Sequence, residues 1–242
     1  MRLTLAGLAA AALLAAPGAA SGSTIEHTVS VVSFEGSYAI DGLVARSERY
    51  ERWVASDRAH QVITNRDTGV LRAEIAEEPQ KFTSFDNLRN EIWTLSGAGA
   101  NSPRGTFVRT LALQGEDIRT QLSKGWLVKA GDTTFLGRPA VKLQSAASAP
   151  RERDTKLTVV ADAETYAPYE RVVTGRENGR SFKQREVLES VETLPLAEFD
   201  YTLYMGSESA RAKRVTFSQQ AKAFRDGLAT KAKKAKKQSS RR

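Results

Sequence analysis

The stretch Tyr169–Val191, YERVVTGRENGRSFKQREVLESV, decides the fold class. Apolar and β-favouring residues recur with a period of about two in Tyr169–Gly175 and again in Phe182–Val191, as in half-buried strands. Between these segments lies Asn178-Gly179, and both residues tolerate the positive φ angles of a tight type I′ turn. The stretch therefore predicts a hairpin of two antiparallel strands.

Similar short segments and turns fill most of the chain before this hairpin. Turn residues follow many of the segments, for example at Arg66–Gly69, Gly97–Gly105 and Ala130–Asp132. Gly115–Gly125 instead predicts a helix, since acidic residues come first and a lysine precedes the last glycine. We predict a mainly β fold, a half-open curved antiparallel barrel of roughly nine to eleven strands with a few plugging helices. The other segments in which apolar and β-favouring residues recur, as candidates for these strands, are Thr28–Phe34, Tyr38–Val44, Arg49–Ala55, His60–Asn65, Val70–Ile75, Lys81–Asp86, Asn90–Leu95, Thr106–Leu111, Trp126–Ala130, Arg138–Ser145 and Lys156–Asp162.

The first residues have the pattern of a secretory signal peptide. Arg2 precedes the apolar run Leu3–Ala16, and Pro17–Ser21 supplies a helix breaker and small residues. The run is shorter than the ~20 residues that cross a bilayer, so an uncleaved anchor is the less favoured alternative. We expect cleavage near residues 20–23 and export to the periplasm or another part of the cell envelope, as a soluble or peripherally membrane-associated protein. The expected organisation is a signal peptide at 1–23, a barrel domain at 24–205 and a basic, partly helical tail at 206–242.

Composition and motifs argue against the common classes of enzyme. The 242 residues include no cysteine and two histidines, so we expect neither a metal site nor a cofactor. Gly97-Ala98-Gly99 lacks the strand–turn–helix context of a nucleotide-binding loop. Glu77-Glu78 predicts a solvated turn, His60 an edge or packed side chain rather than a base, and His27 an exposed side chain. The sequence therefore favours a protein that is not an enzyme.

A set of short patterns resembles the exported superfamily of LolA-like lipoprotein carriers. That superfamily includes the N-terminal domain of RseB-type regulators and mycobacterial lipid-carrying lipoproteins. The resemblance covers roughly residues 45–200, although the lipid-attachment cysteine of the mycobacterial members is absent. The residues that carry it are Glu51-Arg52-Trp53, Phe82–Asp86 with Asn90–Trp93, Trp126–Val128 with Leu136–Leu143, Val159–Pro168, Glu186–Leu188 and Leu194-Pro195.

The resemblance implies a non-enzymatic carrier or binder of lipid or of lipoprotein acyl chains. Trp53, Trp93 and Trp126 are then candidates for the lining of a ligand cavity, although tryptophans at such positions are also common core residues. A second hypothesis is an envelope-stress sensor that binds a membrane protein partner, as RseB-type regulators do. An exported enzyme is the third and least favoured.

The C-terminal segment carries the basic charge of the protein. Residues 211–242 hold 12 Lys and Arg against one acid, whereas the rest of the chain holds 24 against 27. Thr216 and Gln219 fit a capping box at the start of a helix. The tail is interpreted either as a solvated end or as a site for an anionic membrane or wall polymer, and export makes nucleic acid an unexpected partner. The candidate contacts are Lys222, Lys231, Lys233, Lys234, Lys236, Lys237, Arg241 and Arg242.

Overall fold

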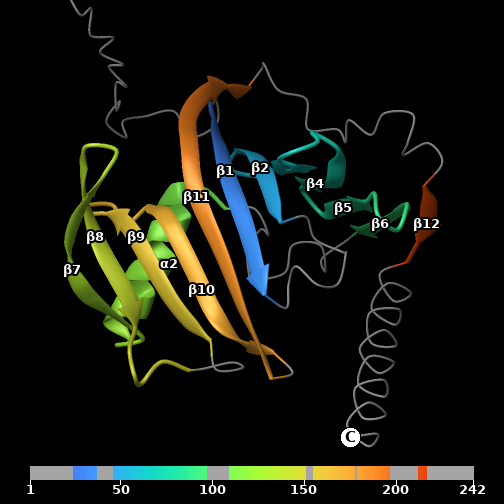
Figure 1. Ribbon diagram of the computed structural model, residues 1–242. Coiled ribbons are helices and arrows are strands. Elements are labelled where there is room, and N and C mark those ends of the chain that lie inside the picture. The colour runs from blue at the N-terminus through green and yellow to red at the C-terminus, as the bar shows by residue number, and fades with distance from the viewer. Residues whose placement is uncertain are drawn as a thin grey trace, which may run out of the picture.

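A computed structural model describes residues 24–36, 46–96, 109–150, 155–177, 179–196 and 212–216. They form one sheet of twelve strands in the order β12-β6-β5-β4-β3-β2-β1-β11-β10-β9-β8-β7, with helix α2 on one of its faces (Figure 1). The fold class is the predicted one, a curved and open antiparallel sheet with a helix against it. The strands are β1 (Thr24–Gly36), β2 (Ser47–Val54), β3 (Ala59–Asn65), β4 (Leu71–Glu78), β5 (Lys81–Asp86), β6 (Glu91–Ser96), β7 (Leu127–Phe135), β8 (Arg138–Ser145), β9 (Lys156–Asp162), β10 (Pro168–Glu177), β11 (Arg180–Pro195) and β12 (Lys213–Val215), and α2 spans Leu111–Ser123.

The hairpin that decides the fold class is present. Strands β10 and β11 pair from Glu170↔Val187 to Glu177↔Arg180, and Gly179 has a φ of +77°. β11 then pairs along its length with β1, which joins the β7–β11 part of the sheet to the β1–β6 part (Figure 1). The predicted bounds of β5, β8 and β9 match those of the structure. The predicted strand at Tyr38–Val44, the signal peptide and most of the tail lie outside the described residues.

Helix α2 begins earlier than the sequence predicts. The strand predicted at Thr106–Leu111 is wrong at its described end, because Leu111 is the first residue of α2. The side chain of Thr110 caps the helix by accepting a hydrogen bond from the Leu113 N–H at 3.2 Å. Glu116 and Asp117, which the predicted helix has in its first turn, therefore lie in the second.

The predicted turn at Ala130–Asp132 is wrong, because β7 continues through it to Phe135. The register shifts between Lys129 and Gly131, so this segment forms a β-bulge. The reversal comes instead at Leu136-Gly137, with φ angles of +48° and +79°. The predicted number of strands is also too low, since twelve are found among the described residues.

The largest described cluster of apolar side chains lies between α2 and the β7–β9 part of the sheet. Ile118 of α2 packs with Leu127, Val141, Leu143, Val159 and Ala161. The helix can approach closely because residue 115 is glycine: a Cβ there would lie 2.4 Å from the Thr165 carbonyl oxygen. The helix thus covers the β7–β9 part of the sheet through this cluster.

Candidate functional site

The two faces of the sheet carry different side chains. We call the face that α2 covers the inner face. Directly paired residues share a face, so the register places Thr28, Arg52, Gln61, Ile75, Ser84 and Trp93 in one row across β1–β6. Thr28 and Arg52 line a pocket together with Leu111 and Gln114 of α2, which identifies this row as part of the inner face.

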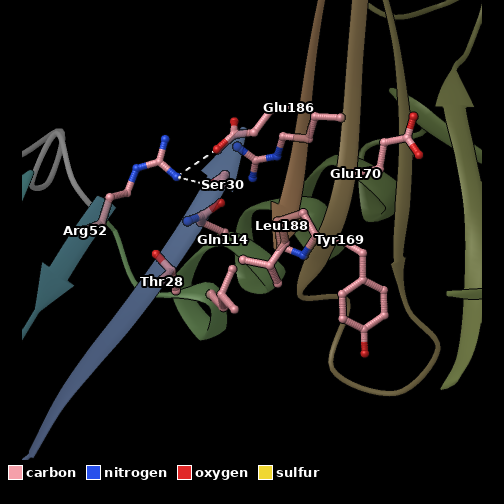
Figure 2. A pocket seen from close by; sticks show the side chains of 11 residues that line it. Thr28, Ser30, Arg52, Gln114, Tyr169, Glu170, Glu186 and Leu188 are labelled. Carbon is pink, nitrogen blue, oxygen red and sulfur yellow. Dashed lines mark hydrogen bonds and ion pairs between the residues drawn. The ribbon is translucent and has the colours of Figure 1, made fainter. Parts of the chain in front are cut away.

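The pocket lies where the first turns of α2 meet the sheet (Figure 2). Its walls come from β1, β2, β10, β11 and α2. Most of the side chains that face it are polar, and its cavity of about 10 Å³ has room for about one water molecule. We call it the polar pocket.

Arg52 is the centre of the hydrogen bonding in the polar pocket. Its guanidinium donates to Glu186 Oε1 at 2.7 Å and to Ser30 Oγ at 3.0 Å, and Figure 2 shows it pointing from β2 toward both. A third bond goes to Gln61 Oε1 at 2.8 Å. The side chains of Arg52 and Glu186 are 15% and 22% exposed, so this ion pair is partly shielded from water.

Arg171 places a second guanidinium beside the same carboxylate. It lies opposite Glu186 in the β10–β11 register. Burial alone would raise the pKa of Glu186, but the charges of Arg52 and Arg171 outweigh it and hold that pKa below its usual range. Burial lowers the pKa of Arg171, and the like charge of Arg52 acts in the same direction, whereas the charges of Glu186 and Asp117 oppose this shift. Two guanidinium groups thus lie beside the carboxylate of Glu186 on the inner face.

A separate apolar surface lies on the inner face of β3–β6. Neighbouring strand pairs bring Gln61, Ile75, Ser84 and Trp93 into one row and Ala59, Glu77, Phe82 and Leu95 into the next. Phe82 and Trp93 contact each other, with ring centroids 4.9 Å apart. Ile63, Ile75, Trp93 and Leu95 are half-buried, and Phe82 is buried. We call Ile63, Ile75, Phe82, Trp93 and Leu95 the apolar surface.

The three candidate tryptophans are not brought together. Trp93 belongs to the apolar surface on the inner face, whereas Trp53 lies on the opposite face between His27 and His60. Trp126 is predicted to lie in a strand, but it precedes β7, and the ammonium of Lys124 lies 4.6 Å from the centre of its ring. A ligand on the inner face could therefore reach Trp93 but not Trp53.

The opposite face contains a stack of three rings. The centroid of Trp53 is 4.7 Å from that of His27 and 5.4 Å from that of His60. Carboxylates contact both histidines: Glu192 is 2.5 Å and Glu51 3.1 Å from His27, and Glu74 is 2.7 Å from His60.

Two predictions about single side chains on this part of the sheet are wrong. His27 is expected to be exposed, but its side chain is only 11% exposed because it stacks on Trp53 within the sheet. Glu77 is 6% exposed and belongs to β4, which continues to Glu78 rather than ending in a solvated turn. His60 is a packed side chain, 1% exposed, as expected.

Sequence reasoning missed the residues of the polar pocket. Arg52, Arg171 and Glu186 occupy positions in strands that look like ordinary solvent-facing charges. The available signal was a charge within each of three β-favouring segments, and pairing across the sheet was needed to bring them together. The candidate tail residues from Lys222 to Arg242 lie outside the described residues. Of the basic segment, the structure describes residues 212–216, which include β12 (Lys213–Val215).

Within the described ranges no three His, Cys, Asp or Glu side chains are grouped as metal ligands would be. No helix in the described part of the chain has the length and apolar character needed to cross a membrane.

Comparisons with known proteins give structural matches only. No family model matches, and no curated protein sequence matches. The chain is similar to an uncharacterized conserved protein from Thermus thermophilus, at 10% identity and a TM-score of 0.47 over 81% of this chain and 91% of that one. It is also similar to a chain in the MucA/MucB complex of Pseudomonas aeruginosa, at 20% identity and a TM-score of 0.44. This match covers 80% of this chain and 58% of that one. A third match is a LolA superfamily protein from Nitrosomonas europaea, at 10% identity and a TM-score of 0.27. This match covers 71% of this chain and 86% of that one. Each of these matches is a similarity of structure at low sequence identity.

Proposed function

We propose that this chain is an exported, non-enzymatic binder or carrier of lipid or of lipoprotein acyl chains. The observation that carries the proposal is the apolar surface. Ile75, Trp93 and Leu95 lie half-buried beside Phe82 on the inner face, where a hydrocarbon chain would be shielded from water on one side by the sheet. Each CH₂ group removed from water contributes about 0.8 kcal/mol. The resemblance of the sequence to LolA-like carriers points to the same class of ligand.

The surroundings of the two histidines, as far as the structure describes them, support the non-enzymatic part of the proposal. Among the described residues the two histidines are held by carboxylates and stacked on Trp53. The hydrogen bonds of His27 go to Glu51 and Glu192 and, among the described residues, not to a serine or threonine hydroxyl that it could activate as a nucleophile.

Solvent extraction followed by mass spectrometry tests the proposal. Protein purified from its own host without detergent is extracted and compared with a variant in which Trp93→Asp and Leu95→Asp place charge on the apolar surface. We expect a lipid or an acylated peptide to be released by the natural protein and to be reduced in the variant. Equal amounts from both, or none from the natural protein, would refute the proposal.

A second candidate function is binding of a membrane protein partner, as RseB-type regulators do. The observation that favours it is β12, which adds to the edge of β6 in parallel with the pairs Lys213↔Glu91 to Val215↔Trp93. An edge that accepts one short extended segment can accept another by the same backbone hydrogen bonds. If a single membrane protein co-purifies with the natural protein but not with a variant substituted in β6, this function would be favoured over the first.

A further inference from the structure

We infer that Arg171 and Arg52 form a binding site for an anionic oxygen group, a carboxylate or a phosphate, at the polar end of the bound lipid. The inference rests on the proposed function, because it assigns the head group of the same ligand. Its basis is the charge in the polar pocket, where two guanidinium groups share one carboxylate, Glu186.

Of the two arginines, Arg171 has the guanidinium group whose N–H donors can still bind an anion. The guanidinium of Arg52 is already bonded to Glu186, Ser30 and Gln61. Within the described part of the chain no side chain forms a hydrogen bond with Arg171, which is half-buried at the wall of the pocket. A partly buried cation without hydrogen bonds is costly, and a second anion would supply both the charge and the acceptors.

The other carboxylates that lie near the pocket are occupied. Glu26 of β1 accepts the Leu111 N–H at the start of α2 at 2.7 Å. Asp117 of α2 pairs with Arg109 at 3.3 Å, and Glu170 of β10 pairs with Arg185 at 2.7 Å. Figure 2 shows Glu170 pointing away from Arg52 and Glu186. Among the residues that line the pocket, Glu186 is therefore the carboxylate that faces both guanidinium groups.

The position of the pocket fits a lipid whose chain lies on the apolar surface. Arg52 shares its inner-face row with Ile75 and Trp93. From β2 to β6 there are four strand spacings, or about 19 Å, a span comparable with an extended long acyl chain. A ligand that lies across these strands would bring its polar end to the pocket. Because the cavity has room for only about one water molecule, a single oxygen atom of the anionic group can enter it while the rest of the group stays at its mouth.

Three probes with the same hydrocarbon chain and different ends test the inference. Palmitate, hexadecyl phosphate and hexadecanol are titrated against the full mature chain at neutral pH, with binding measured by displacement of an uncharged fluorescent acyl probe. We expect at least one anionic probe to bind about tenfold or more tightly than hexadecanol, because a hydrogen bond to a charged group is worth at least that factor. A preference for palmitate identifies a carboxylate, and a preference for hexadecyl phosphate identifies a phosphate.

Arg171→Gln should abolish the preference and leave hexadecanol binding within about twofold of the natural protein. Arg176→Gln is the matched control, since it removes the same charge from an exposed residue five positions along β10. Glu186→Gln should increase the preference for anionic probes over hexadecanol, because it removes the carboxylate that shares the two guanidinium groups. These two variants act in opposite directions, so general damage to the fold cannot imitate the expected pattern.

The outcomes separate this inference from the proposed function. Equal binding of all three probes by the natural protein would overturn the head-group site and leave the acyl binder standing. A preference that survives Arg171→Gln would also overturn the site. Failure to bind any probe would overturn the proposed function and the site with it.

Discussion

Arg52 and Glu186 join β2 to β11 across β1, and their ion pair contributes to stability as well as to the site. Replacing Arg52 with methionine removes bonds to Glu186, Ser30 and Gln61 and leaves a partly buried carboxylate. We predict a loss of about 2–3 kcal/mol in the free energy of unfolding, measured by urea titration at pH 7. The double variant Arg52→Met with Glu186→Leu should recover part of this loss, and no recovery would contradict the pairing.

The same pair predicts the direction of a pH effect. The pKa of Glu186 is lower in the folded protein than its usual value of 4.5. A lowered folded-state pKa gives stability that is fully present above the usual value and lost as the pH falls through the folded-state value. The difference in unfolding free energy between the natural protein and Arg52→Met should therefore shrink as the pH falls below 4.5. A difference that stays constant from neutral to strongly acidic pH would exclude this role of the pair.

Gly115 is a second residue with a testable role. Alanine has the higher helix propensity by about 1 kcal/mol, yet a Cβ at this position would lie 2.4 Å from the Thr165 carbonyl oxygen. We predict that Gly115→Ala destabilises the protein by about 1–3 kcal/mol, because α2 must move away from the β9–β10 turn. Thr120→Ala on the exposed side of α2 is the control and should be neutral or slightly stabilising. Thermal unfolding followed by circular dichroism measures both.

At the scale of elements, period-two patterns predict strands better than glycines predict turns. Lys81–Asp86, Arg138–Ser145 and Lys156–Asp162 match β5, β8 and β9, because their side chains alternate between two differently buried faces. Gly131 is predicted to lie in a turn, but a glycine also serves in a β-bulge, and only the pairing with β8 distinguishes the two. The start of α2 depends on Thr110 as the cap, a signal that is present in the sequence and was missed.

The sequence did not predict strand β12 or its pairing with β6. Three residues in parallel bury little surface, so their contribution should be small. We predict that Arg214→Pro changes the melting temperature little but speeds amide hydrogen exchange in Glu91–Ser96. Exchange in β7, at the other edge of the sheet, is the internal control and should stay the same. Unchanged exchange in β6 would mean that β12 does not protect this edge in solution.

At the scale of the molecule, basic charge is concentrated in the C-terminal segment. Residues 211–242 carry 12 Lys and Arg and one acid, whereas the rest has three more acids than cations, 27 against 24. Each Lys or Arg near an anionic leaflet contributes about 1 kcal/mol, and salt screens the attraction. We predict that deletion of residues 229–242 abolishes binding to anionic vesicles and leaves thermal unfolding nearly unchanged. Co-sedimentation over a salt series measures this, and equal sedimentation of both proteins would contradict the prediction.

The site was less predictable than the fold for a physical reason. Each strand shows its own alternation, but a site on a sheet exists only when residues distant in sequence pair, as Arg52 and Glu186 do across β1. Trp93 lies on the inner face, yet nothing in the local sequence separates it from Trp53. A single register position decides which of the two faces each side chain joins.

That separation supplies the most direct test of acyl binding on the inner face. Two proteins each keep one tryptophan, Trp93 or Trp53, with the other two replaced by phenylalanine. Each is titrated with a fatty acid brominated along its chain, which quenches tryptophan fluorescence only at short range. The account predicts strong quenching in the protein that keeps Trp93 and little in the protein that keeps Trp53, because the two side chains lie on opposite faces of the sheet. Equal quenching of both, or quenching of Trp53 alone, would contradict it.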